Sequence, residues 1–497
     1  MNAQINFVKR AIALLFIGIS LPAAASAQLI SIKSVPVATG DQFLLFPSQN
    51  LGMGSVSIAL DDPMLDPFIN PAKGARMKGA FIFSSPTFYS ISDNMGAARS
   101  LPLSILVGSD QRFGGLFLAA QQMESAEPDG FRTFQLGPKS PGGRFSNNTY
   151  ALGLFGRNLN GSNTAIGGSV FWADLDAVDG VDLLYPGSQD IEQFGSILDL
   201  RVGLISELSD DRSLEAMLLY NRFDMTHDVT YNDWRWIEDL GNSIIDTRME
   251  RNLDRSRTWG VHLGYVVPIG SDGWRLGGIM TGNWVSHPKI PNYELMNIPR
   301  DPGNSWAYNI GLGFSRSEKL SVVGIDFIYE PILSNTWADA AERIETPIGR
   351  IILPGGKTVE NDFQFSNYLL RLGFTSQENE RFGIQFGLQV RSIGYKLVQN
   401  NYVQEFRRKQ RERWQEWTAS FGLILNLQEL QVKYQGRWTT GTGQPGVSGN
   451  ATLESAGDSR GFQSIIVAPS GSLTLLDAHV ITHRITVSIP ITSWSSK

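Results

Sequence analysis

The chain offers few side chains that could catalyse a reaction or hold a metal ion. Its five histidines show no ligand spacing such as H-E-x-x-H and it has no cysteine, so the sequence predicts neither a metal site nor a cofactor. Ser459 follows an acidic residue, Asp458, but it lies in a Gly/Ser-rich segment and not at the strand-turn-helix corner that exposes a nucleophilic serine. We therefore expect no enzymatic activity.

Charged residues are more informative, because they recur on one face of segments whose other face is apolar. Lys433 and Arg437, for example, share a face, and Tyr434 and Trp438 share the opposite one. Arg or Lys facing lipid costs about 2–4 kcal/mol at the bilayer midplane, so such charges must face water or a partner. We expect them to pair with one another and with acidic residues of the N-terminal region, or alternatively to line a polar permeation path. The predicted interior charges are Asp199, Arg201, Arg275, Asp326, Arg371, Arg391, Lys433 and Arg437.

Segments with period-two alternation supply the strands that would position these side chains. In 306–315 every second residue is apolar, from Trp306 to Phe314, and 381–391 repeats the pattern. Each run is about as long as a tilted membrane strand, roughly 9–11 residues, and no apolar run reaches the ~20 residues of a transmembrane helix. A soluble β-sandwich gives the same alternation, so a soluble periplasmic β-protein stays open as an alternative.

The connections between these segments alternate between short turns and longer stretches. Short periplasmic turns and long external loops are typical of outer-membrane barrels, and the pattern predicts an all-β antiparallel transmembrane barrel of about 14–16 strands with a polar lumen. The predicted strands are 78–91, 100–108, 113–124, 148–157, 164–174, 196–207, 213–230, 257–267, 274–286, 305–314, 320–330, 364–375, 381–397, 415–426, 430–440 and 479–493. The predicted external loops lie near 125–147, 175–195, 232–256, 287–304, 331–363, 398–414 and 441–477.

Tryptophans near the predicted strand ends fit the same architecture, because an amphipathic ring prefers the headgroup level of a bilayer. In a soluble β-protein such residues would instead anchor a core. The tryptophans concerned are Trp274, Trp284, Trp306, Trp417, Trp438 and Trp494.

The first residues indicate export. Lys9 and Arg10 precede an apolar run at 11–21, and Ala25-Ser26-Ala27 gives a small-x-small cleavage pattern, so residues 1–27 are predicted to be a signal peptide. Together with the barrel, this predicts a location in the bacterial outer membrane, in contact with its lipid. Removing the two cations of this segment from the formal net charge of −6 leaves about −8, which disfavours nucleic acid as a partner.

Residues 28–77 break the alternation and are predicted to form a plug inside the barrel of residues 78–497. Asp62, Asp66 and Asn70 each precede a proline, and each proline removes a backbone donor and disfavours helix in the residue before it. Asn70 can also cap a short helix that begins at the following proline. The segment therefore reads as compact turns and short helical pieces, and the alternative is a periplasmic linker.

Several residues of this segment resemble a known family. The run Gly52-Met53-Gly54, then Ala59, Asp61-Asp62 and Asn70-Pro71-Ala72-Lys73, resembles the N-terminal signature shared by FadL-type fatty acid transporters and the PorV/PorQ proteins of type IX secretion. The resemblance covers the plug and the first hairpins, and the rest agrees in architecture only. It implies a barrel of about 14 strands, at the lower end of the predicted range. The plug motif it implies is Gly52, Gly54, Asp61, Asp62, Asn70, Pro71, Ala72 and Lys73.

The resemblance implies two alternative functions. In the first, the barrel admits hydrophobic or amphipathic small molecules across the outer membrane, and plug movement opens the route. In the second, the protein is a PorV-like component of a type IX secretion system, and its external loops at 331–363 and 441–477 dock exported proteins.

A basic run in the predicted loop 398–414 suggests one further partner. Arginine binds phosphate in a fork geometry, so the run could contact the phosphates of lipopolysaccharide, although a solvated charged loop or strand extension is an equal alternative. The residues of this run are Arg407, Arg408, Lys409, Arg411 and Arg413.

Overall fold

The computed structural model describes residues 45–91, 97–124, 145–159, 163–177, 190–208, 211–237, 242–270, 272–286, 304–340, 343–445 and 475–491. The predicted signal peptide, the first part of the predicted plug (28–44), Ser459 and Trp494 lie outside these residues. Among the described residues, no helix is long and apolar enough to cross a membrane.

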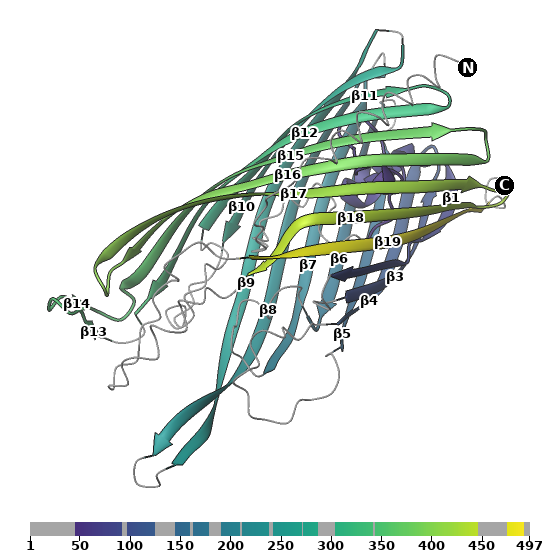
Figure 1. Cartoon of the computed structure of the whole chain (residues 1–497). Helices are drawn as coiled ribbons and strands as arrows, with labels where there is room; N and C mark the ends of the chain where they lie inside the picture. Colours follow the sequence, from purple (N-terminus) through teal and green to yellow (C-terminus); the bar gives the residue numbers. More distant parts are fainter. Residues whose placement is uncertain are drawn as a thin grey trace.

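Strands make up most of the described chain and close into one barrel (Figure 1). Seventeen elements form an antiparallel sheet, and β1 and β2 share one position between β19 and β3, so the ring has sixteen positions. This confirms the all-β antiparallel barrel and places the strand count at the top of the predicted range. The strands are β1 (Gly79–Ser84), β2 (Thr87–Ile91), β3 (Ala97–Gly108), β4 (Arg112–Glu124), β5 (Phe145–Asn158), β6 (Thr164–Leu175), β7 (Asp190–Glu207), β8 (Ser213–Ile237), β9 (Asn242–Ile269), β10 (Trp274–Ser286), β11 (Asn304–Ser317), β12 (Ser321–Asp339), β13 (Ile344–Glu345), β14 (Ile351–Ile352), β15 (Lys357–Gln377), β16 (Phe382–Asn401), β17 (Phe406–Asn426), β18 (Gln431–Pro445) and β19 (Leu475–Ile491).

The single strand predicted over 78–91 is divided into β1 and β2. Pro86 lies in the break, and proline has no N–H to give to a strand ladder. The register against β3 nevertheless continues across it, because Ser84 pairs with Leu103 and Thr87 with Ser100. The two pieces therefore act as one wall position.

The outside of the ring is apolar. Along β11, Trp306 and Leu312 are exposed by 49% and 61%, whereas Ala307 and Asn309 between them are fully buried. In a closed barrel the exposed set faces outward, so its surroundings must be hydrocarbon.

Aromatic rings mark the two borders of this apolar belt. Trp259, Trp284 and Trp306 lie side by side in register across β9, β10 and β11. Trp274 lies at the opposite end of β10 and stacks on Phe314, with ring centroids 4.7 Å apart. Two aromatic levels around an apolar belt are the arrangement of an outer-membrane barrel. The protein is therefore an outer-membrane β-barrel, and the soluble alternative is wrong.

Three segments predicted as external loops are largely strand. β8 and β9 continue through most of 232–256, β12 and β15 enter 331–363 from both ends, and β17 begins at Phe406 within 398–414. These extensions project beyond the ring, and β13 and β14 form a separate hairpin (Figure 1). The apolar alternation is lost there because both faces of a strand outside the bilayer meet water, which hides such strands from a hydropathy pattern. The other predicted loops, near 125–147, 175–195, 287–304 and 441–477, lie largely outside the described residues.

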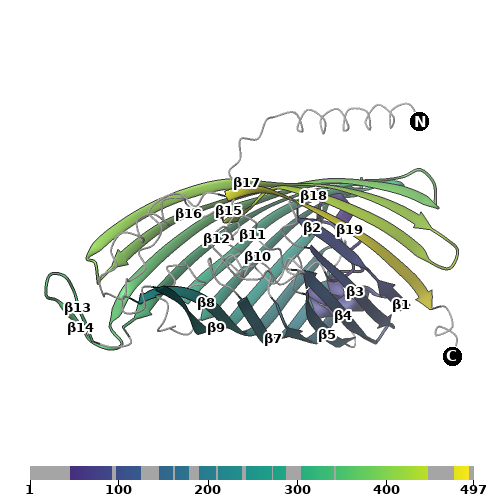
Figure 2. The ribbon, with the colours of Figure 1, turned by 60° about the horizontal axis from the view of Figure 1, so that its bottom comes forward.

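Residues 45–77, called the plug from here on, lie inside the ring (Figure 2). The plug contains η2 (Leu51–Met53), α2 (Asp66–Ile69) and η3 (Pro71–Arg76), joined by turns. η2 contacts β15 to β18, and η3 contacts β3 to β7. The plug therefore reaches wall strands on both sides of the lumen.

Candidate functional site

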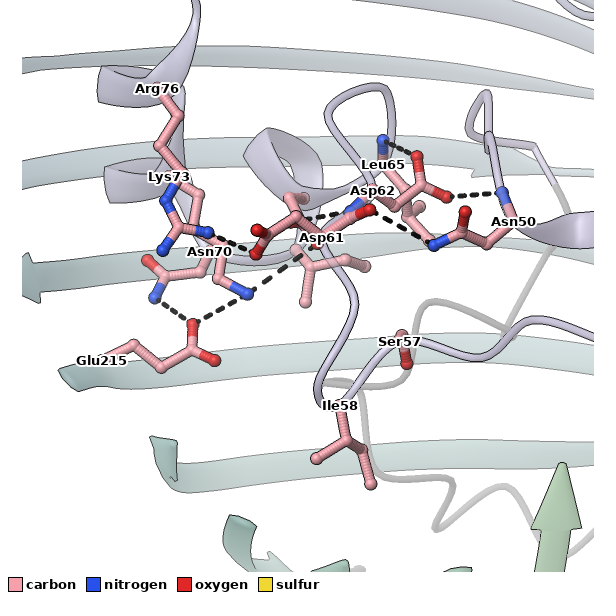
Figure 3. A network of polar contacts seen from close by, with 12 residues as sticks. Asn50, Ser57, Ile58, Asp61, Asp62, Leu65, Asn70, Lys73, Arg76 and Glu215 are labelled. Atoms are coloured by element: carbon pink, nitrogen blue, oxygen red, sulfur yellow. Dashed lines mark hydrogen bonds and ion pairs between the residues drawn. The ribbon is translucent and has the colours of Figure 1, made fainter. Parts of the chain in front are cut away.

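Asp62 organises the first half of the plug. Its carboxylate accepts hydrogen bonds from the backbone N–H groups of Gln49 and Asn50 and from Ser48 Oγ, at distances between 2.7 and 3.1 Å. It also accepts one from the N–H of Leu65 at 3.2 Å (Figure 3). Hydrogen bonds to an ionised acceptor are stronger than neutral ones, so one carboxylate fixes two turns of the plug against each other.

Asn70 and Lys73 connect the second half of the plug to the wall. Asn70 Oδ1 accepts the N–H of Ala72 at 3.2 Å, which is the predicted cap of η3, and its Nδ2 donates to Glu215 of β8 at 3.1 Å. Lys73 Nζ lies 3.1 Å from a carboxylate oxygen of Glu215 and 3.8 Å from one of Asp66 (Figure 3). One ammonium therefore serves two buried carboxyl groups.

The two carboxyl groups do not share Lys73 equally. Burial raises the pKa of Asp66 to about 7, against the opposing effect of Lys73. Burial also opposes the charge on Lys73, but Asp66 and Glu215 outweigh it and raise the pKa of that ammonium. Lys73 thus stays charged, and Asp66 takes up a proton as the pH falls through neutrality.

Asp61 joins the plug to a distant wall strand. It accepts a hydrogen bond from Arg76 of η3 at 2.6 Å and another from Arg275 of β10 at 2.8 Å. Arg76 in turn donates to Glu207 of β7 at 2.7 Å. Burial opposes ionisation of Asp61, but the two guanidinium groups outweigh it and hold its pKa below the usual value. A chain of four charges therefore runs from β7 through the plug to β10.

A cavity of about 420 Å³ adjoins this chain of charges. Arg76 and Glu207 line it together with Asp110 and Gln111, from the short turn between β3 and β4, and Asn158 at the end of β5. Short turns lie on the periplasmic side of outer-membrane barrels. The cavity is therefore a periplasmic vestibule beside the plug.

Two further wall charges hold plug backbone. Asp326 of β12 accepts the N–H of Ser57 at 2.7 Å and that of Ile58 at 3.3 Å. Arg201 of β7 donates to the carbonyl of Ile69 at 2.8 Å, and Asp199 accepts from Arg201 at 2.7 Å. Each satisfies backbone groups that would otherwise be buried without a partner.

The remaining predicted interior charges also lie on the lumen side. Arg371 is paired in register with Asp326, and its Nη1 is 3.5 Å from Ser57 Oγ. Lys433 is close enough to Asp62 for an attractive charge interaction, and Arg437 lies on the same face of β18. The last of the set, Arg391, lies 4.0 Å from the carboxylate of Glu330 on β12.

Glycines in the wall allow the plug to approach closely. A Cβ built on Gly387 would lie 2.0 Å from the backbone nitrogen of Gly54, and one on Gly373 would lie 2.3 Å from the carbonyl oxygen of Met53. On the other side of the lumen, a Cβ on Gly167 would lie 2.7 Å from the carbonyl carbon of Pro71. Real Cβ atoms do not come so close, so only glycine permits this backbone contact.

The lumen wall is divided in chemistry, which corrects the expectation of a polar lumen. The inward side chains of β10 to β19 are mainly amides, hydroxyls and charges. Those of β4 to β7 are mainly apolar, and two plug phenylalanines, Phe46 and Phe68, lie among them. The apolar inward set on these strands includes Phe113, Phe117, Ala119, Tyr150, Leu152, Leu154, Ala165, Phe171, Ala173, Leu175, Ile197 and Ile205.

The basic run lies in β17 and not in a loop. Arg407, Lys409, Arg411 and Arg413 alternate along the strand and are exposed. Arg408 belongs to the opposite, lumen-directed parity of the same strand, because Thr418 and Ser420 of that parity are buried. The strand geometry thus aligns four of the five cations in a column on the outer face.

Several plug-holding residues were not predicted individually. Glu215 and Glu207 carry the ionic contacts described above, Ser420 Oγ accepts the N–H of Gly54 at 2.9 Å, and Arg484 donates to the carbonyl of Phe46 at 2.9 Å. Ser420 and Arg484 lie on the polar parity of their strands, which is a visible signal. That parity shows only that a residue faces inward, not that it meets the plug.

No family model matches the chain, and no curated protein matches it. Among solved structures it is similar to a Pseudomonas aeruginosa FadL homologue, with 12% identity over 89% of this chain and 98% of that one and a TM-score of 0.44. It is similar to the Pseudomonas putida toluene transporter TodX, with 11% identity over 88% and 96% of the two chains and a TM-score of 0.38. For the Ralstonia pickettii toluene transporter TbuX the identity is 10% over 89% and 97%, with a TM-score of 0.40.

Proposed function

We propose that the protein admits hydrophobic or amphipathic small molecules across the outer membrane through its lumen, and that movement of the plug opens the route. The apolar inward faces of β4 to β7, called the apolar strip from here on, support this proposal most directly. An apolar strip beside a polar one offers a path along which an oily solute stays out of water.

Aromatic contacts tie the apolar strip to the plug. The ring of Phe46 lies 4.8 Å from that of Phe117 on β4 and 6.1 Å from that of Phe171 on β6, centroid to centroid. Phe46 also stacks on Phe68 of α2 at 5.1 Å. A solute that slides along β4 to β6 would therefore meet the plug on its apolar side and compete with its aromatic packing.

The test is uptake of an apolar fluorescent dye, N-phenylnaphthylamine, by cells that produce the protein in an otherwise intact outer membrane. We expect faster uptake than in cells without the protein, and a loss of the gain in Phe171→Asp, which puts a charge on the apolar strip. The matched control is Gln389→Asp, because Gln389 is buried on β16, among the polar inward side chains of β10 to β19. This variant should retain uptake. Uptake equal to that of cells without the protein, with the barrel correctly inserted, contradicts the proposal.

The plug contacts do not bear on the alternative of docking exported proteins, which stays a prediction. Of its two predicted surfaces, 331–363 is in large part strand and 441–477 lies mostly outside the described residues.

We also propose that the outward column of Arg407, Lys409, Arg411 and Arg413 contacts lipopolysaccharide. The column continues on the neighbouring strand, because Lys396 of β16 is exposed and pairs in register with Arg411. Closely spaced positive charges on neighbouring strands repel one another unless anions lie between them. Phosphate groups of the outer leaflet are the anions nearest to the external end of an outer-membrane barrel, and arginine binds phosphate with two parallel hydrogen bonds.

A further inference from the structure

Three polar side chains on the inward faces of β10 and β11 take no part in the plug contacts described above. Asn283 of β10 and Ser305 and Asn309 of β11 are 2%, 0% and 0% exposed and point to the lumen side of their strands. Asn309 Nδ2 and Oδ1, Asn283 Oδ1 and Ser305 Oγ have no hydrogen-bond partner among the described residues. Leaving a buried polar group without a partner costs about 1–3 kcal/mol, so this arrangement favours the binding of something polar.

The group lies just external to the plug. Gly311, one inward position closer to the periplasm than Asn309, faces Ile58 of the plug, whose Cδ1 would be 2.7 Å from a Cβ at that glycine. The β-ladder is also interrupted at this level: β11 pairs with β12 at Ala307 and again at Ile310, but not in between, where β12 carries Pro331. The amide of Asn309 therefore lies at an irregular part of the wall, directly above the plug.

An apolar patch adjoins these polar atoms on the side away from the plug. Ala307, which lies between Ser305 and Asn309 on the same face, packs with side chains of β12, β15 and β16. The members of this patch are Ala307, Ile332, Phe363, Phe365 and Leu397, with Ile393 packed against them. These side chains are themselves buried, at 0–6% exposed, so the alkyl or aryl part of a solute bound at Asn309 would enter between them.

The charge and hydrogen-bonding capacity of the group select the kind of solute. Asn309 Oδ1 is an acceptor and needs a ligand that donates, whereas Asn309 Nδ2 donates and Ser305 Oγ can do either, so the ligand must offer both a donor and an acceptor. An ionised carboxylate has no proton to donate, and it would also lie near Glu330, which is one strand away from Asn309. A hydroxyl or a primary amide both donates and accepts, and it carries no charge to desolvate.

We propose that Asn283, Ser305 and Asn309 form a subsite of the lumen that binds the uncharged hydroxyl or amide group of an amphipathic molecule. The proposal rests on the uptake function proposed above and narrows its substrate class to neutral amphiphiles over fatty-acid anions. The apolar part of the molecule enters the patch of Phe363 and Phe365. Its neutral head group binds on the external side of the plug and is released toward the periplasm when the plug moves.

The test uses two photoreactive probes on the full-length protein in outer-membrane vesicles: a long-chain alcohol and the matching carboxylate, each with a diazirine near the polar end. We expect the alcohol to label peptides of β10, β11 and β12, and unlabelled alcohol to displace it. Labelling by the alcohol should be about tenfold more efficient than labelling by the carboxylate, which corresponds to 1.4 kcal/mol. Equal labelling by both probes would contradict the proposed preference for neutral amphiphiles over fatty-acid anions.

Two variants locate the binding. Asn309→Leu should reduce labelling by the alcohol about tenfold, because it removes both a donor and an acceptor. Ser169→Ala, a serine of β6 that is 4% exposed on the opposite wall, should leave it unchanged. Heat-modifiable migration on a gel verifies that each variant forms the barrel.

The outcomes separate this subsite from the proposed function. If the alcohol labels β4 to β7 but not β10 to β12, the subsite is wrong and lumen uptake stands. If neither probe labels any lumen strand, both proposals fail. If Asn309→Leu keeps full labelling at β11, then the unpartnered atoms hold water only, and the subsite is wrong.

Discussion

Gly54 of the plug and Gly387 of β16 meet backbone to backbone: a Cβ on Gly387 would lie 2.0 Å from the nitrogen of Gly54. The same N–H of Gly54 donates to Ser420 Oγ on the adjacent strand at 2.9 Å. A glycine in the wall therefore makes room for a plug hydrogen bond that a larger residue would prevent.

Gly387→Val should displace this part of the plug. Overfilling a packed contact costs about 1–3 kcal/mol, and here the new atoms would overlap backbone, which cannot rotate away. We expect larger single-channel conductance in planar bilayers and faster cleavage of the plug by protease. Gly153→Val is the control, because a Cβ at Gly153 meets nothing within 4 Å. Wild-type conductance in Gly387→Val would show that the plug does not need this contact.

Lys73→Met should destabilise the docked plug more than replacing both Lys73 and Glu215 by uncharged residues. Lys73 lies 3.1 Å from Glu215, and both side chains are largely buried. Breaking a buried pair from one side leaves an uncompensated charge and costs about 3–5 kcal/mol. The double variant Lys73→Met/Glu215→Gln should recover part of that loss. The urea concentration at which protease cleaves the plug measures how firmly the plug is held in each variant. A plug that is held less firmly in the double variant than in Lys73→Met would contradict the prediction.

Plug docking should weaken as the pH rises through about 7. Burial raises the pKa of Asp66 to about 7 from its ordinary value of 3.8, so between these values the docked plug binds a proton that an undocked Asp66 has released. The state that binds more protons gains stability as the pH falls, hence docking is stronger at pH 5 than at pH 8. Lys73 remains charged at both pH values.

Asp66→Asn isolates this effect. The neutral amide replaces a group that titrates, so protease protection of the plug should become nearly independent of pH in this range. Asp61→Asn serves as the comparison: the pKa of Asp61 lies below its usual value, so that carboxylate stays ionised at pH 5 and above. The prediction fails if wild-type protection rises with pH, or if Asp66→Asn keeps the wild-type pH dependence.

Replacing Arg407, Lys409, Arg411 and Arg413 together by Gln should reduce binding of lipopolysaccharide to the purified barrel. The cations face outward from β17, so the loss should be greatest at low salt, where charge interactions are least screened. Arg408→Gln, on the lumen-directed parity, is the control and should bind like the wild type. Equal binding of lipopolysaccharide with and without its phosphates would contradict the phosphate contact.

Local sequence patterns determined the class of the protein and the environment of each strand face. Alternation of residues along 306–315 determines which side of β11 meets lipid, because successive side chains of a strand point in opposite directions whatever surrounds it. The cap of η3 is equally local: Asn70 and Ala72 are two residues apart, and an asparagine before a proline suffices to form it.

Tertiary structure alone decided which inward residues meet the plug. Arg275 and Asp61 are 214 positions apart in sequence, and Asn70 and Glu215 are 145 apart. Their contact depends on strand number, on the stagger between strands and on the depth of the plug, which are properties of the closed ring and not of any one strand. The division of the lumen into an apolar and a polar wall also appears only on closure, when strands β4 to β7 come to face β10 to β19 across one space.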